Sequence, residues 1–523
     1  MRDKFYYAFG LVLIGFILFF AMLHDLRWFI VISIPLAALY LYDVIQTKHS
    51  ILRNFPILGH IRYVFEFIRP EIQQYFIADD LVERPFNREA RSLIYARAKK
   101  VRDTIPFGTR HDLLEVGYDG ILHSLNAKHP DEVEKRIIIG NEQCGQPYSS
   151  SHLNISGMSF GALSANAVMA MNLGAKIGGF AQATGEGGLS PYHLQGGDVI
   201  WQIGTAYFGC RNLDGTFNPD YFAKDAQRPE VKMIELKLSQ GAKPSHGGIL
   251  PAAKLTKEIA EIRKVPMGQD VFSPPTHSAF GNPIEMMHFI QKLRELSGGK
   301  PVGFKLCIGH KKEFLSICKG MLATGIVPDF ITVDGAEGGT GAAPVEFVNR
   351  VGMPLAEGLA FVQNAMMGVG LRNKVCIAAS GKISTGFTLA AAMGLGADVC
   401  NAARAMMLAT GCVQSLQCNA NTCPTGVTTH DKRLQKGLVV EDKKYRVANF
   451  HAATIHSFYE LVGAMGLTSP SDITPDHIYK RISPTEIRTY RELYHFIPEG
   501  SLLGNNIPVH YAEDWANARA DVF

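Results

Sequence analysis

The sequence predicts an α/β fold: a TIM (β/α)8 barrel with an N-terminal transmembrane hairpin and a helical connecting region. Two observations predict the barrel. Eight short β-rich runs recur between residues 152 and 402, and most are separated by enough chain for a crossover helix. A doubly wound sheet is the rival, but no GxGxxG motif follows the first run. The eight runs are 152–156, 179–184, 199–204, 232–236, 302–306, 330–333, 375–379 and 398–402.

A third observation, two apolar runs near the N-terminus, predicts the membrane segment. Residues 5–23 carry no charge, and a helix of this length rises about 28 Å, close to the thickness of the hydrocarbon layer. A second run, Trp28 to Tyr42, holds Pro35 and follows after a short polar connection. We expect a hairpin; the alternatives are one span with an interfacial helix, or a signal peptide, although no small-residue cleavage site precedes the second run.

Basic residues set the expected orientation of that hairpin. Arg2 and Lys4 precede the first run and Lys48 and Arg53 follow the second, whereas Arg27 stands alone between them. The positive-inside tendency then places the chain in an inner or plasma membrane with its catalytic domain in the cytoplasm. Nine cysteines fit a reducing compartment. A net charge of +4 is too mild to indicate a nucleic-acid partner.

The composition and patterning divide the chain into four parts. The connecting region contains a predicted helix that breaks at Pro70, and the tail has helix-start signals at Thr474 and Pro475. The parts are the transmembrane hairpin (1–48), the helical connecting region (49–145), the barrel (146–465) and a C-terminal helical tail (466–523).

Three cysteines form the most specific chemical motif. Cys412, Cys418 and Cys423 are spaced C-x5-C-x4-C and are followed by Pro424. Closely spaced soft thiolates suit a thiophilic metal, and three of them suit a cuboidal iron–sulfur cluster that lacks one iron. The alternatives are zinc, with His430 as a fourth ligand, or no metal. A cluster implies electron transfer and therefore a redox cofactor nearby.

Glycine-rich strand ends predict a phosphate site. Gly338, Gly339, Thr340 and Gly341 follow the sixth run, and backbone N–H groups there can converge on an anion. Gly381 and Arg404 follow the last two runs, where barrels usually bind phosphate. Tight βα turns are the alternative interpretation. Lys305 lies within the fifth run and suits the electron-rich edge of a flavin; alternatively it neutralises a buried carboxylate.

The segments SGMSFGALS, TGEGG, QGAKP, GGTGAAP and the cysteine run, in this order over about 150–465, resemble the FMN-binding synthase domain of glutamate synthase. The whole chain resembles the stand-alone FMN-binding glutamate synthase family proteins. The resemblance implies a TIM barrel that holds FMN beside a three-iron (3Fe-4S) cluster. In that family, reduced FMN delivers hydride to 2-iminoglutarate, formed from 2-oxoglutarate and ammonia, to give L-glutamate.

The resemblance also implies roles for individual residues. Cys412, Cys418 and Cys423 would bind the cluster, Lys243 and Arg263 would meet the substrate carboxylates, and Glu186 would lie near the imino nitrogen. The residues expected to contact FMN are Ser156, Gly157, Met158, Gln182, Thr184, Lys305, Gly339, Thr340 and Gly381.

The chain departs from the family pattern in ways that bear on substrate and partners. His246 stands where a Glu is usual, and Ile249 replaces a Gln. No amidotransferase or nicotinamide-binding domain is recognisable, so ammonia is expected free or from another subunit, and electrons from a ferredoxin or an NAD(P)H-oxidising subunit. The alternatives are an N-methylglutamate synthase-like flavoenzyme acting on another imine or keto acid, and a membrane-tethered electron-transfer protein.

Overall fold

The computed structural model of the chain describes residues 15, 19, 26–101 and 103–523. The chain divides into two compact units, Met1–Glu89 and Ala90–Phe523. The second unit contains every residue predicted above to bind a cofactor, a metal or a substrate.

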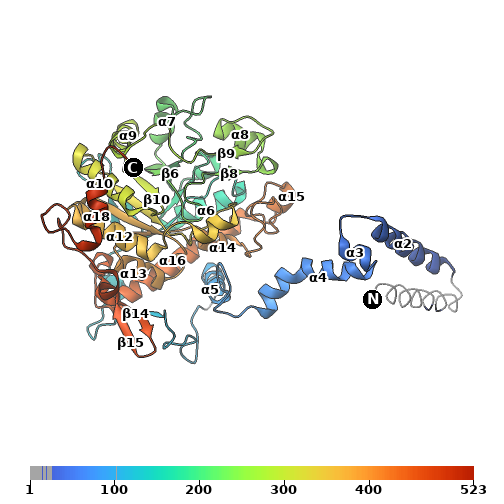
Figure 1. The fold of residues 1–523 in the computed structure, drawn as a ribbon. Coiled ribbons are helices and arrows are strands. Elements are labelled where there is room, and N and C mark those ends of the chain that lie inside the picture. The colour runs from blue at the N-terminus through green and yellow to red at the C-terminus, as the bar shows by residue number, and fades with distance from the viewer. Residues whose placement is uncertain (1–14, 16–18, 20–25, 102) are drawn as a thin grey trace. The chain divides into compact units, whose positions relative to one another are not determined.

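Eight parallel strands close into a barrel in the second unit (Figure 1). Each strand pairs with the next along the chain, and the last, β13, pairs with the first, β4, through Cys400 and Leu153. This is the predicted (β/α)8 arrangement, and all eight predicted runs are barrel strands. They are β4 (Leu153–Ile155), β5 (Ala181–Ala183), β6 (Asp198–Ile203), β7 (Val231–Lys237), β10 (Val302–Leu306), β11 (Phe330–Asp334), β12 (Cys376–Ser380) and β13 (Val399–Ala402).

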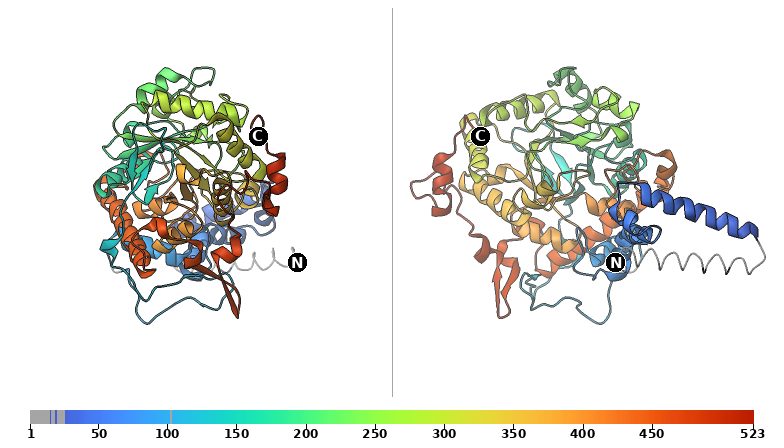
Figure 2. Two further views of the ribbon diagram at one scale, coloured as in Figure 1. Left: turned by 90° about the vertical axis from the view of Figure 1, so that its left-hand side faces the viewer. Right: turned by 45° about the vertical axis from the view of Figure 1, so that its right-hand side comes forward.

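Helices cover the outside of the strands, as two further views show (Figure 2). Between β5 and β6 the chain forms only a 3-10 turn, Pro191–His193, instead of a crossover α-helix. The long helix α16 packs on α6 and α13 and buries Phe450 and Phe458 completely, each worth about 2–3 kcal/mol of apolar burial. The covering helices are α6 (Ala165–Gly178), α7 (Pro219–Ala226), α9 (Pro283–Leu296), α10 (Lys311–Thr324), α12 (Leu355–Gly368), α13 (Gly386–Gly394), α14 (Arg404–Thr410) and α16 (Val440–Ala464).

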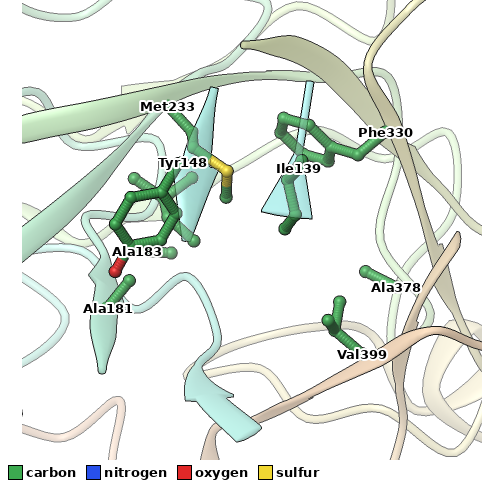
Figure 3. Close-up of a cluster of buried hydrophobic side chains, with 9 residues drawn as sticks. Ile139, Tyr148, Ala181, Ala183, Met233, Phe330, Ala378 and Val399 are labelled. Atoms are coloured by element: carbon green, nitrogen blue, oxygen red, sulfur yellow. The ribbon is translucent and has the colours of Figure 1, made fainter. Parts of the chain in front are cut away.

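A hairpin closes the amino end of the barrel. It consists of β2 (Ile137–Ile139) and β3 (Tyr148–Ser150), which pair antiparallel. Ile139 and Tyr148 are buried in one apolar cluster with Met233, Phe330 and other residues near the starts of the barrel strands (Figure 3). This cluster fills the interior of the barrel at its amino end.

The barrel interior becomes more polar toward that carboxyl end. Met233, Glu235 and Lys237 alternate along β7 and therefore share one face of the strand. Glu235 is buried and accepts hydrogen bonds from the Thr332 hydroxyl at 2.6 Å and from the Gln202 side-chain amide. The carboxylate is thus satisfied without a cation, as a buried polar group requires.

A long excursion separates β7 from α9. It carries a two-stranded hairpin, β8 (Ile249–Leu250) with β9 (Val271–Phe272), and the short helix α8 (Lys257–Arg263) between these strands. The short helix α11 (Val345–Arg350) lies between β11 and β12. Further elements lie before and after the barrel strands: α5 (Arg88–Ala98), β1 (Asp119–Ile121), α15 (Lys432–Gln435), β14 (Ile478–Ser483), β15 (Glu486–Thr489), α17 (Tyr490–Tyr494) and α18 (Val509–Asn517). The tail therefore contains a β-hairpin, β14–β15, which pairs with β1.

The first unit corrects two predictions. Of the residues described, none belongs to a helix that is both long and apolar enough to cross a membrane. The second predicted span lies in α2 (Leu26–Ile45), which includes Asp43; this buried carboxylate accepts from Ile57 N at 2.8 Å and lies 3.0 Å from His60 Nε2. The first predicted span falls almost wholly outside the described residues. The hairpin, and the membrane location inferred from it, are therefore not supported.

The second correction concerns Pro70. The helix predicted to break there, α4 (Leu58–Ile72), continues through Pro70 and is followed by a π-helical turn, Gln73–Ile77. It is preceded by α3 (Ser50–Asn54). Pro70 lies in the last turn of α4, so the hydrogen bond that it cannot donate to Glu66 O is lost near the end of the helix. The four-part division of the chain stays a prediction.

Candidate functional site at the carboxyl end of the barrel

The carboxyl ends of the barrel strands bring most of the predicted site residues to one mouth. Parallel strands in a closed barrel all end on the same side. Ser156 follows β4, Glu186 follows β5 by three residues, Lys305 lies in β10, Gly381 follows β12 and Arg404 begins α14 after β13. Residues far apart in the sequence are thereby collected into one site.

Lys305 lies at the centre of a buried polar group. Its Nζ is 3.5 Å from Ser156 Oγ and 3.5 Å from Asp334 Oδ1. Ser156 Oγ lies 3.3 Å from Ser380 Oγ, and the other Asp334 oxygen accepts from Gly241 N at 2.8 Å. Lys305 therefore has a carboxylate partner, as the alternative interpretation of this lysine expected.

Glu186 forms the anionic centre of a second group. Lys237 Nζ lies 2.9 Å from Glu186 Oε1, and both side chains are largely buried. Burial by itself raises the pKa of Glu186, but the charge and hydrogen bond of Lys237, and then the charges of Lys243 and Arg263, lower that pKa below its ordinary value. Glu186 is thus an ionised carboxylate at neutral pH.

Lys243 and Arg263, the cations predicted to bind the substrate, lie close enough to Glu186 to lower its pKa. Each also donates a hydrogen bond to a backbone carbonyl oxygen. Lys243 is buried and donates to Ala342 O at 2.7 Å. Burial lowers the pKa of Lys243 to about 8, although Glu186 opposes the shift. Arg263 is also buried and donates to Phe160 O at 3.2 Å. Burial lowers the pKa of Arg263 to about 10.

Two glycines leave room for the Glu186 carboxylate. A Cβ atom on Gly204 would lie 2.7 Å from Glu186 Oε2, and one on Gly248 would lie 2.6 Å from Oε1. Both distances are shorter than van der Waals contact. The carboxylate therefore occupies a slot that any larger residue at either glycine would fill.

A small pocket opens beside this carboxylate. It holds about 20 Å³, close to the space that one water molecule needs. The pocket is lined by Glu186, Thr205, Lys237, Leu238, Ser239, Gln240, Lys243, Ser245, Gly247 and Pro275. Of the two residues that depart from the family pattern, His246 packs edge-on against Phe347, with ring centroids 4.9 Å apart, and Ile249 pairs with Phe272 in the β8–β9 hairpin.

The predicted phosphate residues gather at the ends of β11, β12 and β13. Thr340 Oγ1 accepts from Gln240 Nε2 at 3.4 Å, which links the glycine-rich loop to the pocket. Arg404 donates to Glu337 O at 2.5 Å, and a Cβ on Gly339 would lie 2.7 Å from its Cδ. Burial lowers the pKa of Arg404, against the opposing charges of Asp334 and Glu337. Gly338 N donates to Gly335 O at 2.8 Å, while Gly341 has open space where a Cβ would point.

The remaining predicted flavin contacts lie on β4 and β5. A Cβ on Gly157 would lie 2.9 Å from the Gln202 amide, so the turn Ser156–Met158 runs tightly over the barrel interior. Thr184 Oγ1 accepts from Gln202 N at 3.1 Å. Among the described residues, the buried side-chain oxygens of Gln182 and Asn401 have no hydrogen-bond partner. Gln182 alternates with the core residues Ala181 and Ala183, and its amide donates to Val168 O of α6 at 3.4 Å, so its side chain faces that helix. Asn401 lies two residues from the core residue Val399 on β13, and its unpaired oxygen is what a bound group with an N–H or O–H donor would satisfy.

The three cysteines lie in a loop of unusual backbone shape. Gln414, Leu416 and Asn421 all adopt left-handed backbone conformations, with φ of 57°, 57° and 61°. Such residues cost roughly 1 kcal/mol or more each. The thiols of Cys418 and Cys423 are near enough to Cys412 to contribute to a raised pKa of Cys412 of about 12, which burial mainly causes. The loop is thus shaped around the thiols despite its conformational cost.

Hydrogen bonds favour a thiolate at Cys423. Burial alone would raise the pKa of Cys423, but hydrogen bonds from Thr428 and Thr425 outweigh it and lower the pKa below its ordinary value. The buried Lys254 ammonium lies beside the loop and donates to Cys418 O at 3.1 Å and to Ala162 O at 2.8 Å.

Within the described part of the chain, no three His, Cys, Asp or Glu side chains are arranged to hold a metal ion. His430, the predicted alternative zinc ligand, donates from Nε2 to Gly161 O at 2.8 Å instead. Burial lowers the pKa of His430 to about 4.

Several site residues escaped sequence analysis. Asp334, which pairs with Lys305, and Thr205, which lines the pocket, are not singled out by the sequence. Lys237, which pairs with Glu186, is among the polar residues that the end of the fourth predicted strand offers, but the sequence indicates no role for it. The available signal was a charged residue at the last position of an apolar strand, and both Lys237 and Asp334 show it.

Comparisons with known proteins bear on this geometry. The conserved region in glutamate synthase matches residues 78–468. The chain belongs to the glutamate synthase family. It is 38% identical over 512 residues to the glutamate synthase large subunit-like protein YerD of Bacillus subtilis, covering 89% of this chain and 97% of that relative. It is 35% identical over 317 residues to an archaeal NADPH glutamate synthase of Methanocaldococcus jannaschii, covering 60% of this chain and 59% of the relative.

Similarity to solved structures is weak by comparison. The flavin-binding domain of baker's yeast flavocytochrome b2 is 11% identical, with 82% of this chain and 89% of that chain covered and a TM-score of 0.42. A mandelate oxidase variant covers 82% of this chain and 99% of its own length, with 13% identity and a TM-score of 0.40. Similarity at this level says nothing of cofactor or substrate. This glutamate synthase family member spans most of the YerD relative but about three fifths of the archaeal enzymes.

Proposed function

We propose that this chain is a flavin- and iron–sulfur-dependent oxidoreductase of the glutamate synthase type. It reduces 2-iminoglutarate, formed from 2-oxoglutarate and ammonia, to L-glutamate with electrons from an external donor. The observation that carries this proposal is the ionised Glu186 among three buried cations, Lys237, Lys243 and Arg263, at the carboxyl end of a barrel in a member of this family.

The charges of the pocket suit a dicarboxylate. Lys243 and Arg263 bind the two carboxylates of the keto acid, exchanging carbonyl partners for charge-assisted hydrogen bonds. Lys237 keeps Glu186 ionised, and Glu186 accepts a hydrogen bond from the protonated imino nitrogen and orients the imine carbon. Each side chain thus binds or positions the substrate.

The residues at the barrel mouth fit FMN. The phosphate would be held by Gly338, Gly339, Thr340, Gly341, Gly381 and Arg404, and the ring system by Ser156, Gly157, Met158, Gln182, Thr184 and Lys305. The unpaired oxygen of Asn401 supports this assignment because a flavin ring and its ribityl chain carry donors. When bound, the flavin supplies the hydride, while the protein positions the substrate and excludes water.

The cysteine loop suits a 3Fe-4S cluster. Cys412, Cys418 and Cys423 would each bind a different iron through a thiolate. The strained loop and the lowered pKa of Cys423 support a thiolate ligand at that residue, whereas burial raises the pKa of Cys412 and Cys418. Electrons would come from a ferredoxin or an NAD(P)H-oxidising subunit, and ammonia from solution or another subunit.

A second candidate is reduction of a different imine, as in an N-methylglutamate synthase-like enzyme. It is favoured by Ile249, whose side chain offers no amide for a substrate hydrogen bond, and by His246, which packs on Phe347. The pocket lining includes Ser245 and Gly247 but neither of these two residues.

Reoxidation of the photoreduced holoenzyme under anaerobic conditions tests both candidates. We expect 2-oxoglutarate with ammonium to reoxidise the flavin, and faster turnover with methylamine would favour the second candidate. Lys243→Met should slow the reaction by weakening keto-acid binding, whereas Lys257→Met, at a lysine whose side chain is 86% exposed, should not. If neither amine reoxidises the flavin, both candidates are wrong.

A further inference from the structure

A single excursion of the chain forms the roof of the pocket. We call residues 241–276, between the end of β7 and the approach to α9, the roof. Lys243, Ser245, Gly247 and Pro275 of the roof line the pocket, as does Glu186, which follows β5. The pocket volume of about 20 Å³ accommodates one water and not a keto acid. The roof must therefore move for a substrate of that size to enter.

The far end of the roof is fastened to two strand ends. Thr205 Oγ1, after β6, donates to Pro274 O at 2.6 Å. His277 Nε2 lies 2.9 Å from Lys237 O, the carbonyl of the last residue of β7. Because a carbonyl only accepts, Nε2 carries the proton and Nδ1 is an acceptor. The chain leaves the barrel after Lys237, forms the roof, and contacts Lys237 again about 40 residues later through His277.

Tyr207 completes this fastening. Its hydroxyl lies 3.0 Å from His277 Nδ1, to which it donates, and it accepts from Ala279 N at 3.1 Å. Every polar atom of the His277 and Tyr207 side chains is therefore paired. The imidazole also stacks on Phe280, with ring centroids 4.9 Å apart. Burial lowers the pKa of His277 to about 4, which keeps the ring in the neutral form that this arrangement requires.

The backbone of Tyr207 indicates that this position is held under constraint. Tyr207 is fully buried and has a φ of 51°, a left-handed conformation that costs a bulky residue roughly 1 kcal/mol or more. The backbone there is held by hydrogen bonds from Tyr207 N to Gly204 O at 3.0 Å and from Cys210 N to Tyr207 O at 2.9 Å.

We propose that His277 and Tyr207 form a latch that holds the roof closed over the pocket and fixes the backbone of Lys237. Both are positioning residues: His277 acts on Lys237 through its carbonyl, and Lys237 in turn holds Glu186. The latch determines the equilibrium between a closed and an open roof, and the affinity for the substrate depends on that equilibrium. This role rests on the proposed function only in taking the pocket as the keto-acid site.

Hydrogen–deuterium exchange of the holoenzyme without substrate tests the latch directly. His277→Phe keeps the ring volume and removes both nitrogens, and Tyr207→Phe removes only the hydroxyl. We expect peptides within 241–276 to exchange about tenfold faster in His277→Phe and less so in Tyr207→Phe, because local opening becomes easier. Peptides from β12 and β13 should exchange as in the wild type. His451→Phe, at a buried histidine on α16, should leave roof exchange unchanged.

Steady-state kinetics give the second readout. Because the keto acid enters only when the roof is open, a loosened roof raises the fraction of enzyme that admits it, so we expect KM for the keto acid to fall about tenfold and kcat to change less than about threefold. Unchanged roof exchange in folded Tyr207→Phe and His277→Phe would overturn the latch, and so would a uniform acceleration over the whole chain. Since exchange is measured without turnover, a failure of the proposed reaction would leave the exchange result standing.

Discussion

Lys237 Nζ lies 2.9 Å from Glu186 Oε1, although 51 positions separate the two residues in the sequence. Lys237 also donates to Gln240 Oε1 at 2.6 Å, so the ammonium links the carboxylate to the loop after β7. The pair is largely buried, where an opposite charge strongly stabilises an ionised carboxylate. The protonation state of Glu186 therefore depends on Lys237.

Removing the Lys237 charge should move the pH profile of the enzyme. In Lys237→Met we expect the pKa of Glu186 to rise, because burial then acts with less opposition. The acidic limb of the kcat/KM profile should shift to higher pH, and kcat/KM at neutral pH should fall about 100-fold, or about 2.7 kcal/mol. Lys237→Arg retains the charge and should move the limb less. An acidic limb that stays in place in Lys237→Met would contradict this role.

Loss of the Lys243 charge should weaken substrate binding at alkaline pH. Burial lowers the pKa of Lys243 to about 8, so its charge is lost as the pH rises through that value. We expect KM for the keto acid to increase above about pH 8, with kcat less affected, because an anionic substrate loses a cation. Lys243→Arg stays charged over this range and should remove the increase. A KM that is flat from pH 7 to about pH 9 in the wild type would argue against substrate binding by Lys243.

The three loop cysteines should be needed for iron. Individual Ser substitutions of Cys412, Cys418 and Cys423 should lower bound iron and the visible absorbance of the cluster, since thiolates are its ligands. Cys318→Ser, at a buried cysteine on α10 whose pKa burial raises to about 12, should retain both. Elemental analysis with electron paramagnetic resonance measures the outcome. Zinc in place of iron in the wild type would show that the cluster assignment is wrong.

Gly248 should be intolerant of even one added methyl group. A Cβ there would lie 2.6 Å from Glu186 Oε1, and the ion pair with Lys237 restricts how far that carboxylate can withdraw. We expect Gly248→Ala to reduce kcat/KM about tenfold or more through displacement of the reacting geometry. Gly504→Ala, where no atom lies within 4 Å of the added Cβ, serves as the matched control. Equal activity of the two variants would contradict the proposed place of Glu186.

Buried neutral histidines should make the protein sensitive to acid. Burial lowers the pKa of His152 to about 4 and that of His193 and His451 to about 3, well below the unfolded value. Their stabilising contribution is complete above about pH 6.5 and is lost as the pH falls, at up to about 1.4 kcal/mol per group and pH unit. Urea titrations between pH 7 and about pH 4 should show a steep fall in the free energy of unfolding. A flat profile would indicate that these rings are protonated in the folded protein.

The barrel strands could be predicted because their signals are local in the sequence. Each barrel strand is a short β-rich run followed by a glycine-rich turn, and both signals lie within a few residues of each other. The hairpin prediction rested on apolarity alone. It could not foresee that Asp43, within the second run's helix, accepts a hydrogen bond from Ile57 and is buried beside His60.

By itself, the sequence determined the eight-stranded barrel, the family and the spacing of the three cysteines, because these depend on local periodicity and on contiguous motifs. Only the tertiary structure decided which charges meet. Closure of the barrel brings Lys237 into an ion pair with Glu186 and Lys305 into one with Asp334. The path of the chain after the roof brings His277 into a hydrogen bond with the Lys237 carbonyl. Such pairs depend on distances in space across the strand ends, which spacing along a chain does not encode.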